Sequence, residues 1–239
     1  MSLSNFFRRI AARPALSHGN PLEGKRLRYL IGCDGDVTGK DGEIFVVGYD
    51  VDNPPLYGIG VGYCNLFDEK NRGEYGPYLR SSNTAARYRE GQIDPRGPSF
   101  ERNLCEQLRR RKAHGFRYVE FDNPDAYSVA DVLRAVRLAA AHSLAVLAKN
   151  PLLMEGDPTQ YVAECCGVIV ERGAGSPPDM DALRRRAGKP DMPVWFVAFG
   201  SGRSWAEAVA RQARNFRNMY VTYSSAGEYG NSIDVELAP

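Results

Sequence analysis

The strongest constraint on the fold is a regular alternation of strand-like and helix-like segments after residue 100. Strand-like runs begin roughly every 23 to 27 residues, and a helix-like stretch lies between each pair of runs. Strands that are joined through helices form parallel sheets with right-handed crossovers. The runs are rich in Val, Ile, Phe and Tyr, which is typical of strands covered on both faces. The predicted strands are 118–122, 144–149, 167–171, 193–199 and 219–224, and the predicted helices are 99–114, 128–141, 159–165, 180–187 and 205–217.

The first hundred residues follow a different pattern, with three strand-like runs and only short gaps between them. The runs RLRYLIGCDGD, EIFVVGYDVD and LYGIGVGYCN are separated by residues 37–42 and 53–55. Neither gap can hold a crossover helix, and parallel strands need a connection of about a dozen residues or more. These three strands are therefore predicted to pair as an antiparallel meander.

Three strands and five strands make eight, which favours a (β/α)8 TIM-like barrel, an α/β fold, with an irregular, helix-poor N-terminal third. A doubly wound open sheet is the alternative. We expect residues 1–24 to form an N-terminal extension with a short helix, and residues 25–239 to form a single barrel domain. The polar stretch 68–98, which is rich in Gly, Pro, Asn and Arg, is expected to be a long functional loop or lid.

Composition argues against several classes of function. The 239 residues carry a net charge of only +2, and the arginine runs 109–111 and 184–186 are interpreted as solvated helix faces, so no nucleic-acid partner is expected. No apolar run is long enough for a membrane span. Five cysteines and three widely spaced histidines fit no metal motif, and we expect no metal or other cofactor. No signal peptide is visible, which indicates a cytoplasmic protein, and the oligomeric state stays open.

Acidic side chains gather at the carboxyl ends of the predicted strands, where active sites form in both parallel architectures. Glu120 and Asp122 share one face of their strand because side chains alternate along a strand. Glu171 ends the next strand but one, so Asp122 and Glu171 are expected to face each other across the mouth of a barrel. The other polar residues at strand ends are Asp34, Asp36, Asp50, Asp52, Asn65, Asn123, Lys149, Asn150, Arg172, Ser224 and Ser225.

Two opposed carboxyl groups suit the cleavage of a glycosidic bond. One carboxylic acid protonates the leaving oxygen, and the other group attacks the anomeric carbon or activates water. Like charges that are held close favour a proton on one of them, which supplies an acid near neutral pH. For each acid taken singly, the alternative is a structural ion pair with Lys149, Arg172 or a helix N-terminus.

Several segments resemble glycoside hydrolase family 114, the endo-α-1,4-polygalactosaminidases and their relatives. GFRYVEFDNPDAY is similar to the G-x-x-G-V-E-P-D-N-x-D-x-Y segment of that family, and AAAHSLAVLAKN is similar to its A-H-x-x-G-L-x-x-x-L-K-N segment. GVIVERGAG resembles the V-x-E-x-C strand, and VWFVAFG resembles the strand after it. FVVGYDVD and GQIDPRGPSF resemble two earlier segments of the family.

The resemblance implies a (β/α)8 barrel that cleaves α-1,4-linked galactosamine polymers, often from microbial biofilm matrix, and it implies an exported protein. It also implies that Asp122 and Glu171 are the catalytic pair. An acid-rich mouth would suit a cationic polysaccharide substrate. The residues that would line the sugar site are Asp50, Glu120, Asn123, Lys149 and Asn150.

Two other functions stay open. Phe121 stands where the family has Pro, and Arg172-Gly173 replace a polar residue and a Cys. One alternative is therefore a catalytically inactive barrel that binds sugar. The string YLIGCDGDVTG resembles the nucleophile loop of haloacid-dehalogenase-type phosphatases, which implies, as a lesser alternative, a Mg²⁺-dependent phosphatase that uses Asp34 and Asp36. Such a string is also common in turns.

Overall fold

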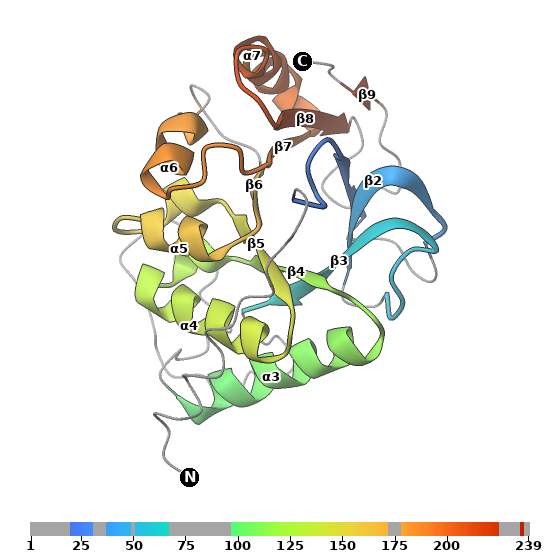
Figure 1. Ribbon diagram of the computed structural model, residues 1–239, viewed down its shortest axis with the longest axis vertical. Helices are drawn as coiled ribbons and strands as arrows, with labels where there is room; N and C mark the ends of the chain where they lie inside the picture. Colours follow the sequence, from blue (N-terminus) through green and yellow to red (C-terminus); the bar gives the residue numbers. More distant parts are fainter. Residues whose placement is uncertain are drawn as a thin grey trace.

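The chain folds as a barrel of parallel strands with helices around it (Figure 1). The computed structural model describes residues 20–30, 37–48, 51–66, 97–171, 178–224 and 235–236. The predicted (β/α)8 TIM-like barrel is confirmed, because the first eight strands follow one another in chain order around the sheet. They are β1 (Arg26–Leu30), β2 (Gly39–Val47), β3 (Tyr57–Asn65), β4 (Tyr118–Asp122), β5 (Ala145–Lys149), β6 (Gly167–Glu171), β7 (Val194–Phe199) and β8 (Met219–Ser224).

The predicted antiparallel meander of the first three strands is wrong, because β1, β2 and β3 pair in parallel. The pairing of β1 with β2 runs only from Arg26 opposite Glu43 to Leu30 opposite Val47. Five residues of strand span about 17 Å. A connection such as residues 31–38 can cross that distance at about 3.3 Å per residue. Because only these five residue pairs join β1 and β2, the chain can return in parallel without a crossover helix.

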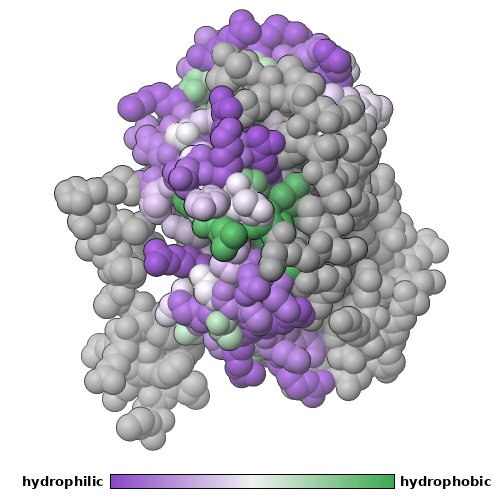
Figure 2. All heavy atoms as spheres, turned by 90° about the vertical axis from the view of Figure 1, so that its right-hand side faces the viewer, coloured by the Kyte–Doolittle hydropathy of each residue, from purple (hydrophilic) through white to green (hydrophobic). Residues whose placement is uncertain are grey.

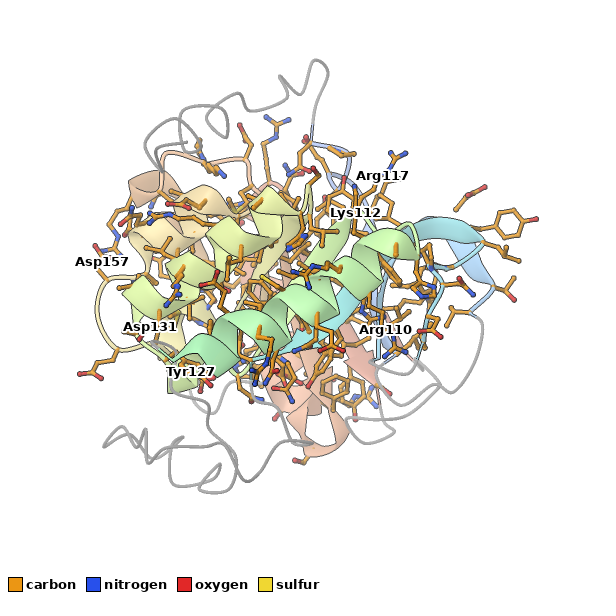
Figure 3. All side chains as sticks on the ribbon, turned by 90° about the horizontal axis from the view of Figure 1, so that it is seen from below. Arg110, Lys112, Arg117, Tyr127, Asp131 and Asp157 are labelled. Carbon is orange, nitrogen blue, oxygen red and sulfur yellow. The ribbon has the colours of Figure 1, made fainter. Side chains whose placement is uncertain are left out.

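Five α-helices lie along the outside of the later strands in the described part of the chain. They are α3 (Pro98–Ala113), α4 (Val129–Ala141), α5 (Thr159–Glu164), α6 (Met180–Arg186) and α7 (Arg203–Ala213). As predicted, Ser128 caps α4, because its hydroxyl oxygen accepts a hydrogen bond from the N–H of Asp131 at 3.1 Å. Gly115 follows α3 with a φ of +91°, a conformation that glycine adopts without strain. Figures 1 and 3 show α3 and α4 side by side.

Apolar side chains form two layers that the strands separate. Leu147, Ile169 and Trp195 belong to the cluster that fills the barrel lumen. Phe121 and Val136 belong to the larger cluster between the strands and the helices. Because side chains alternate, the positions two residues after a lumen residue also face the lumen. The rows of β4, β5 and β6 therefore carry polar side chains into the mouth of the barrel.

The barrel is nearly closed, and side-chain hydrogen bonds link its last strands to residues at and just before its first strand. The hydroxyl of Thr222 on β8 donates to the carbonyl oxygen of Leu27 on β1 at 3.0 Å. The indole N–H of Trp195 on β7 donates to the carbonyl oxygen of Lys25 at 2.8 Å. A ninth strand, β9 (Val235–Glu236), pairs antiparallel with β8 and was not predicted.

A buried arginine on α3 links the end of β2 to β3 through hydrogen bonds. Arg111 on α3 is only 2% exposed. Its guanidinium donates to the carbonyl oxygens of Gly48 at 2.8 Å, Val51 at 2.6 Å and Tyr63 at 2.8 Å. The end of β2, the turn after it and β3 are thereby tied to one helix.

The interpretation of the arginine runs as solvated faces is wrong for one residue in each run. Arg184 is also buried, and its guanidinium donates to the carbonyl oxygens of Met192 at 2.8 Å and Arg217 at 2.9 Å. A guanidinium has five donors, so it can satisfy several carbonyl groups at once. Arg110, labelled in Figure 3, lies nearer the surface and pairs with Asp52.

Polar residues predominate among the described residues on the face that Figure 2 shows, and apolar ones gather near its middle. No helix within the described ranges is both long and apolar enough to cross a membrane. The predicted N-terminal helix and nearly all of the loop 68–98 lie outside the described residues. The boundary at residue 24 stays a prediction.

Candidate active site

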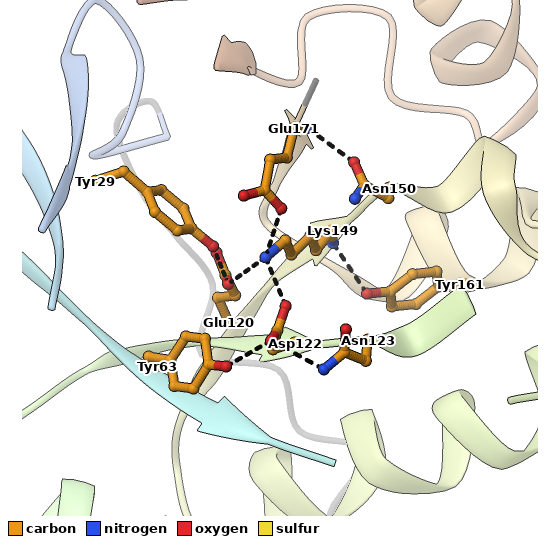
Figure 4. A network of polar contacts seen from close by, with 9 residues as sticks. All are labelled: Tyr29, Tyr63, Glu120, Asp122, Asn123, Lys149, Asn150, Tyr161 and Glu171. Atoms are coloured by element: carbon orange, nitrogen blue, oxygen red, sulfur yellow. Dashed lines mark hydrogen bonds and ion pairs between the residues drawn. The ribbon is translucent and has the colours of Figure 1, made fainter. Parts of the chain in front are cut away.

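The ammonium group of Lys149 is the centre of the polar cluster at the barrel mouth (Figure 4). Lys149 Nζ lies 2.6 Å from Asp122 Oδ1 and 2.8 Å from Glu171 Oε2. It lies 3.5 Å from Glu120 Oε1, which is the longest of the three contacts. One buried cation thus contacts three carboxyl groups from two strands.

Strand geometry explains why these side chains meet. β5 lies between β4 and β6 in the sheet and pairs with both. Glu120 and Asp122 are on the lumen face of β4, while Lys149 ends β5 and Glu171 ends β6. The structure therefore brings Asp122 and Glu171 together at one ammonium.

The same Asn-Pro turn ends two of these strands. Asn123 after β4 has a φ of +56°, and Asn150 after β5 has a φ of +44°. Proline disfavours the right-handed helical region for the residue before it, and asparagine tolerates the left-handed one better than most residues do. Asn123 Nδ2 donates to Asp122 Oδ2 at 2.9 Å, and the N–H of Glu171 donates to Asn150 Oδ1 at 2.8 Å. Asn123 therefore holds the carboxyl group of Asp122, and Asn150 holds the backbone of Glu171.

Three tyrosines support the cluster, and the sequence analysis did not single them out. The Tyr29 hydroxyl donates to Glu120 Oε1, and the Tyr63 hydroxyl donates to Asp122 Oδ2 at 2.5 Å. The Tyr161 hydroxyl accepts a hydrogen bond from the N–H of Lys149 at 3.2 Å. Tyr29 and Tyr63 lie on lumen rows of β1 and β3, so the alternation of those strands was the available signal.

Burial makes Glu120 unlike the other two acids. Its side chain is fully buried, whereas those of Asp122 and Glu171 are 18% and 22% exposed. Burial is the main cause that raises the pKa of Glu120 to about 7, with Lys149 acting in the opposite direction and Asp122 adding to the rise. A carboxyl group in the cluster is therefore half protonated near neutral pH.

The basic and phenolic groups keep their protons. Burial alone would lower the pKa of Lys149, but the oxygens of Tyr29, Glu120, Asp122 and Glu171 raise it well above its usual value. Burial, and then the nearby acids, raise the pKa of Tyr29 and of Tyr63. Lys149 is therefore a cation, and both tyrosines are hydrogen-bond donors.

Some predicted site residues lie elsewhere or outside the described part of the chain. Asp52 pairs with Arg110, whose Nε and Nη2 contact Asp52 Oδ1 at 2.9 and 2.5 Å, away from the cluster. The backbone of Asn65 exchanges hydrogen bonds with Gln107. Within the described ranges, no group of three or more His, Cys, Asp or Glu is arranged to hold a metal ion. The residues outside the described ranges are Asp34, Asp36, Asp50, Arg172 and Ser225.

Comparison with solved structures shows which folds this barrel resembles. No protein-family model and no curated protein matches the chain. Ega3 of Aspergillus fumigatus, solved in complex with galactosamine, has a TM-score of 0.63 at 12% identity, over 91% of this chain and 97% of that chain. The glycoside hydrolase domain of PelA from Pseudomonas aeruginosa has a TM-score of 0.53 at 12% identity, over 88% of this chain and 99% of that chain.

The chain has the fold of a glycoside hydrolase domain. The barrel implied by the resemblance to family 114 is thereby confirmed. In this glycoside hydrolase fold, the cluster around Lys149 lies at the carboxyl ends of the strands, where barrels of this class carry their active sites. The groups that this cluster offers for chemistry are two partly exposed carboxyl groups, the Lys149 ammonium and the buried carboxyl group of Glu120.

Proposed function

We propose that the protein is a glycosidase that cleaves α-linked amino-sugar polysaccharides, with Asp122 and Glu171 as its two carboxyl groups. The observation that carries this proposal is their shared contact with Lys149. The two oxygens lie 2.6 and 2.8 Å from the same nitrogen, so they are no more than about 5.4 Å apart, the two contacts laid end to end. Retaining glycosidases place their carboxyl groups about 5 to 5.5 Å apart.

The hydrogen bonds around each acid support separate roles. Asp122 accepts hydrogen bonds from Tyr63, Asn123 and Lys149. These donors hold its carboxyl group in a fixed position, which suits the nucleophile that attacks the anomeric carbon. Glu171 contacts Lys149 and is the more exposed of the two. Glu171 is therefore assigned as the general acid that protonates the leaving oxygen and then, as a base, activates water.

The charge of the cluster supports a cationic sugar as the substrate. Three carboxyl groups surround one ammonium, so the mouth keeps a negative charge even when one of the acids is protonated. Negatively charged clefts attract cationic ligands. Ega3, a structural neighbour, was solved with galactosamine. The proposed sugar-lining residues are Asp50, Glu120, Asn123, Lys149 and Asn150, of which Asp50 lies outside the described residues.

A reducing-end assay on partly deacetylated α-1,4-galactosaminogalactan tests the proposal. The wild-type protein is expected to release new reducing ends from this polymer and none from a neutral α-1,4-glucan. If the protein binds the amino-sugar polymer and releases nothing, the sugar-binding barrel is the correct function. If it neither binds nor cleaves the polymer, the proposed substrate class is wrong.

A further inference from the structure

Glu120 lies too deep in the barrel to touch a substrate. The resemblance to family 114 makes it a sugar-lining residue, but its side chain is fully buried, and a side chain without exposed surface does not contact a sugar. Its Oε1 accepts a hydrogen bond from the Tyr29 hydroxyl and lies 3.5 Å from Lys149 Nζ. Any contribution of Glu120 to the reaction must therefore pass through its neighbours in the cluster.

The Lys149 ammonium needs support, because both proposed catalytic acids depend on its position. Lysine carries its charge at the end of a flexible four-carbon chain. Lys149 Nζ is within 2.8 Å of an oxygen of Asp122 and of Glu171, so a displacement of Nζ disturbs both contacts at once. An ammonium has three N–H donors, and Figure 4 shows three carboxyl groups on different sides of it. Glu120 is the third and deepest of these carboxyl groups.

Tyr29 on β1 holds Glu120 in place. Glu120 Oε2 has no hydrogen-bond partner among the described residues, so Oε1 is the oxygen through which the carboxyl group is oriented there. The Tyr29 ring is buried, lies 5.2 Å from Lys149 Nζ, within the range of a cation–π contact, and packs edge-on against Phe199 on β7. A proton on Oε2 would leave Oε1 an acceptor, so this support does not depend on the charge of Glu120.

We propose that Glu120 and Tyr29 are positioning residues that hold the Lys149 ammonium between the two proposed catalytic acids. This inference rests on the proposed glycosidase function and gives Glu120 a role without sugar contact. The contacts run from Tyr29 through Glu120 to Lys149, and from Lys149 to Asp122 and Glu171. A misplacement of about 1 Å at a catalytic group can cost about 100-fold in rate. Since neither positioning residue touches the substrate, their loss lowers kcat and leaves KM unchanged.

Steady-state kinetics on partly deacetylated α-1,4-galactosaminogalactan separate this role from sugar contact. Glu120→Ala removes the support, so kcat is expected to fall about 100-fold while KM changes by less than about twofold. Glu120→Gln keeps an acceptor oxygen and is expected to restore kcat to within about tenfold of the wild type. Tyr29→Phe keeps the buried ring, loses the hydroxyl donor and is expected to lower kcat about tenfold. Glu101→Gln on the exposed face of α3 is the matched control and keeps the wild-type values.

Proton–nitrogen NMR of the lysine ammonium groups follows Lys149 without any substrate. A buried ammonium that is held by carboxyl groups is protected from hydrogen exchange with water. The wild-type protein is expected to show a resolved ammonium signal near neutral pH that is absent from Lys149→Met and present in the surface control Lys112→Met. The signal is expected to weaken or disappear in Tyr29→Phe and in Glu120→Ala, because the ammonium is no longer fixed.

The two measurements distinguish failure of this inference from failure of the proposed function. If the wild type shows no protected Lys149 ammonium, or if Tyr29→Phe and Glu120→Ala keep both the signal and kcat, the inference is wrong even in an active glycosidase. A rise in KM at unchanged kcat would show that Glu120 contacts the sugar, which also overturns it. A wild type that cleaves nothing, but whose ammonium signal depends on Glu120 and Tyr29, removes the proposed function and supports the assignment of these two residues as the support of Lys149.

Discussion

Glu120 and Asp122 are two residues apart on one strand, yet the barrel gives them different chemistry. Both face the lumen, but Glu120 is fully buried, while Asp122 is 18% exposed. Depth in the lumen therefore raises the pKa of Glu120, while Asp122, nearer the mouth, accepts hydrogen bonds from three donors. Two carboxyl groups of one row thereby have different surroundings.

The pH dependence of stability is expected to reveal the buried acid. The pKa of Glu120 is raised in the folded protein from 4.5 to about 7. The folded state therefore binds this proton more tightly, and the associated stability is present below pH 4.5 and is lost as pH rises through 7. The shift corresponds to about 3 kcal/mol. Urea unfolding at pH 5 and pH 8 is expected to show this loss in the wild type relative to Glu120→Gln, and an identical pH dependence in the two proteins would contradict it.

The sequence predicted where the charged residues of the candidate site lie, because strand alternation and strand ends place them. Glu120, Asp122, Lys149 and Glu171 all follow from these two rules. Tyr29 and Tyr63 were not predicted, because a tyrosine in a strand is ordinary and its partner lies on a distant strand. The raised pKa of Glu120 could not be predicted from the sequence either, because it depends on burial in the folded barrel.

At the scale of elements, the order β4, β5, β6 sets the distance between the two proposed catalytic acids. Because both acids contact Lys149 on the middle strand, their oxygens are close enough for a double displacement. The first product of cleavage is therefore expected to keep the α configuration. Proton NMR of the reducing end within the first minutes checks this, and an initial β-anomer would mean that the acids act on a water between them instead.

Arg111 is expected to stabilise the packing of β2 and β3 against α3. Its guanidinium satisfies carbonyl oxygens from the end of β2, the following turn and β3. Arg111→Ala is expected to lower the free energy of unfolding by about 3 kcal/mol or more, because buried carbonyl groups lose charged donors. Arg109→Ala on the exposed side of the same helix is expected to change it by less than about 0.5 kcal/mol. Urea denaturation of both variants measures the difference, and equal effects would contradict the assigned role.

Local rules predicted most elements, and one of them failed for a geometric reason. The helix that Ser128 caps and the strand before Asn123 needed only capping and periodicity. The parallel pairing of β1, β2 and β3 was missed because only short segments of these strands pair, so a connection without a helix suffices. Buried Arg111 was missed because a run of three arginines on a helix does not show which of them faces inward.

At the scale of the whole molecule, close packing of side chains in the barrel lumen contributes to stability. Gly167 on β6 faces Trp195 on β7, and a Cβ at Gly167 would come within 2.6 Å of the indole ring. Gly167→Ala is therefore expected to cost about 1–3 kcal/mol of stability through overpacking. The same substitution is expected to cost less when Trp195 is replaced by Phe, because the smaller ring leaves room. Urea unfolding of the four proteins measures this coupling, and additive effects would contradict the packing account.

The overall architecture was predictable because regular strand and helix spacing leaves few topologies, and the barrel was confirmed on that basis. The near closure of the barrel was not predictable in detail. It depends on contacts between distant parts of the chain, such as the hydrogen bond from Thr222 to Leu27. Predicted features that lie outside the described residues, including Asp34, Asp36 and Asp50, stay predictions.

The central claim is that Asp122 and Glu171 together cleave the glycosidic bond. Its most direct test compares reducing-end release from partly deacetylated α-1,4-galactosaminogalactan by the wild type, Asp122→Asn, Glu171→Gln and the surface control Glu101→Gln. We expect each of the two site variants to lose about 10²–10⁴-fold in rate while the control keeps the wild-type rate. Release that survives in both site variants would contradict the claim.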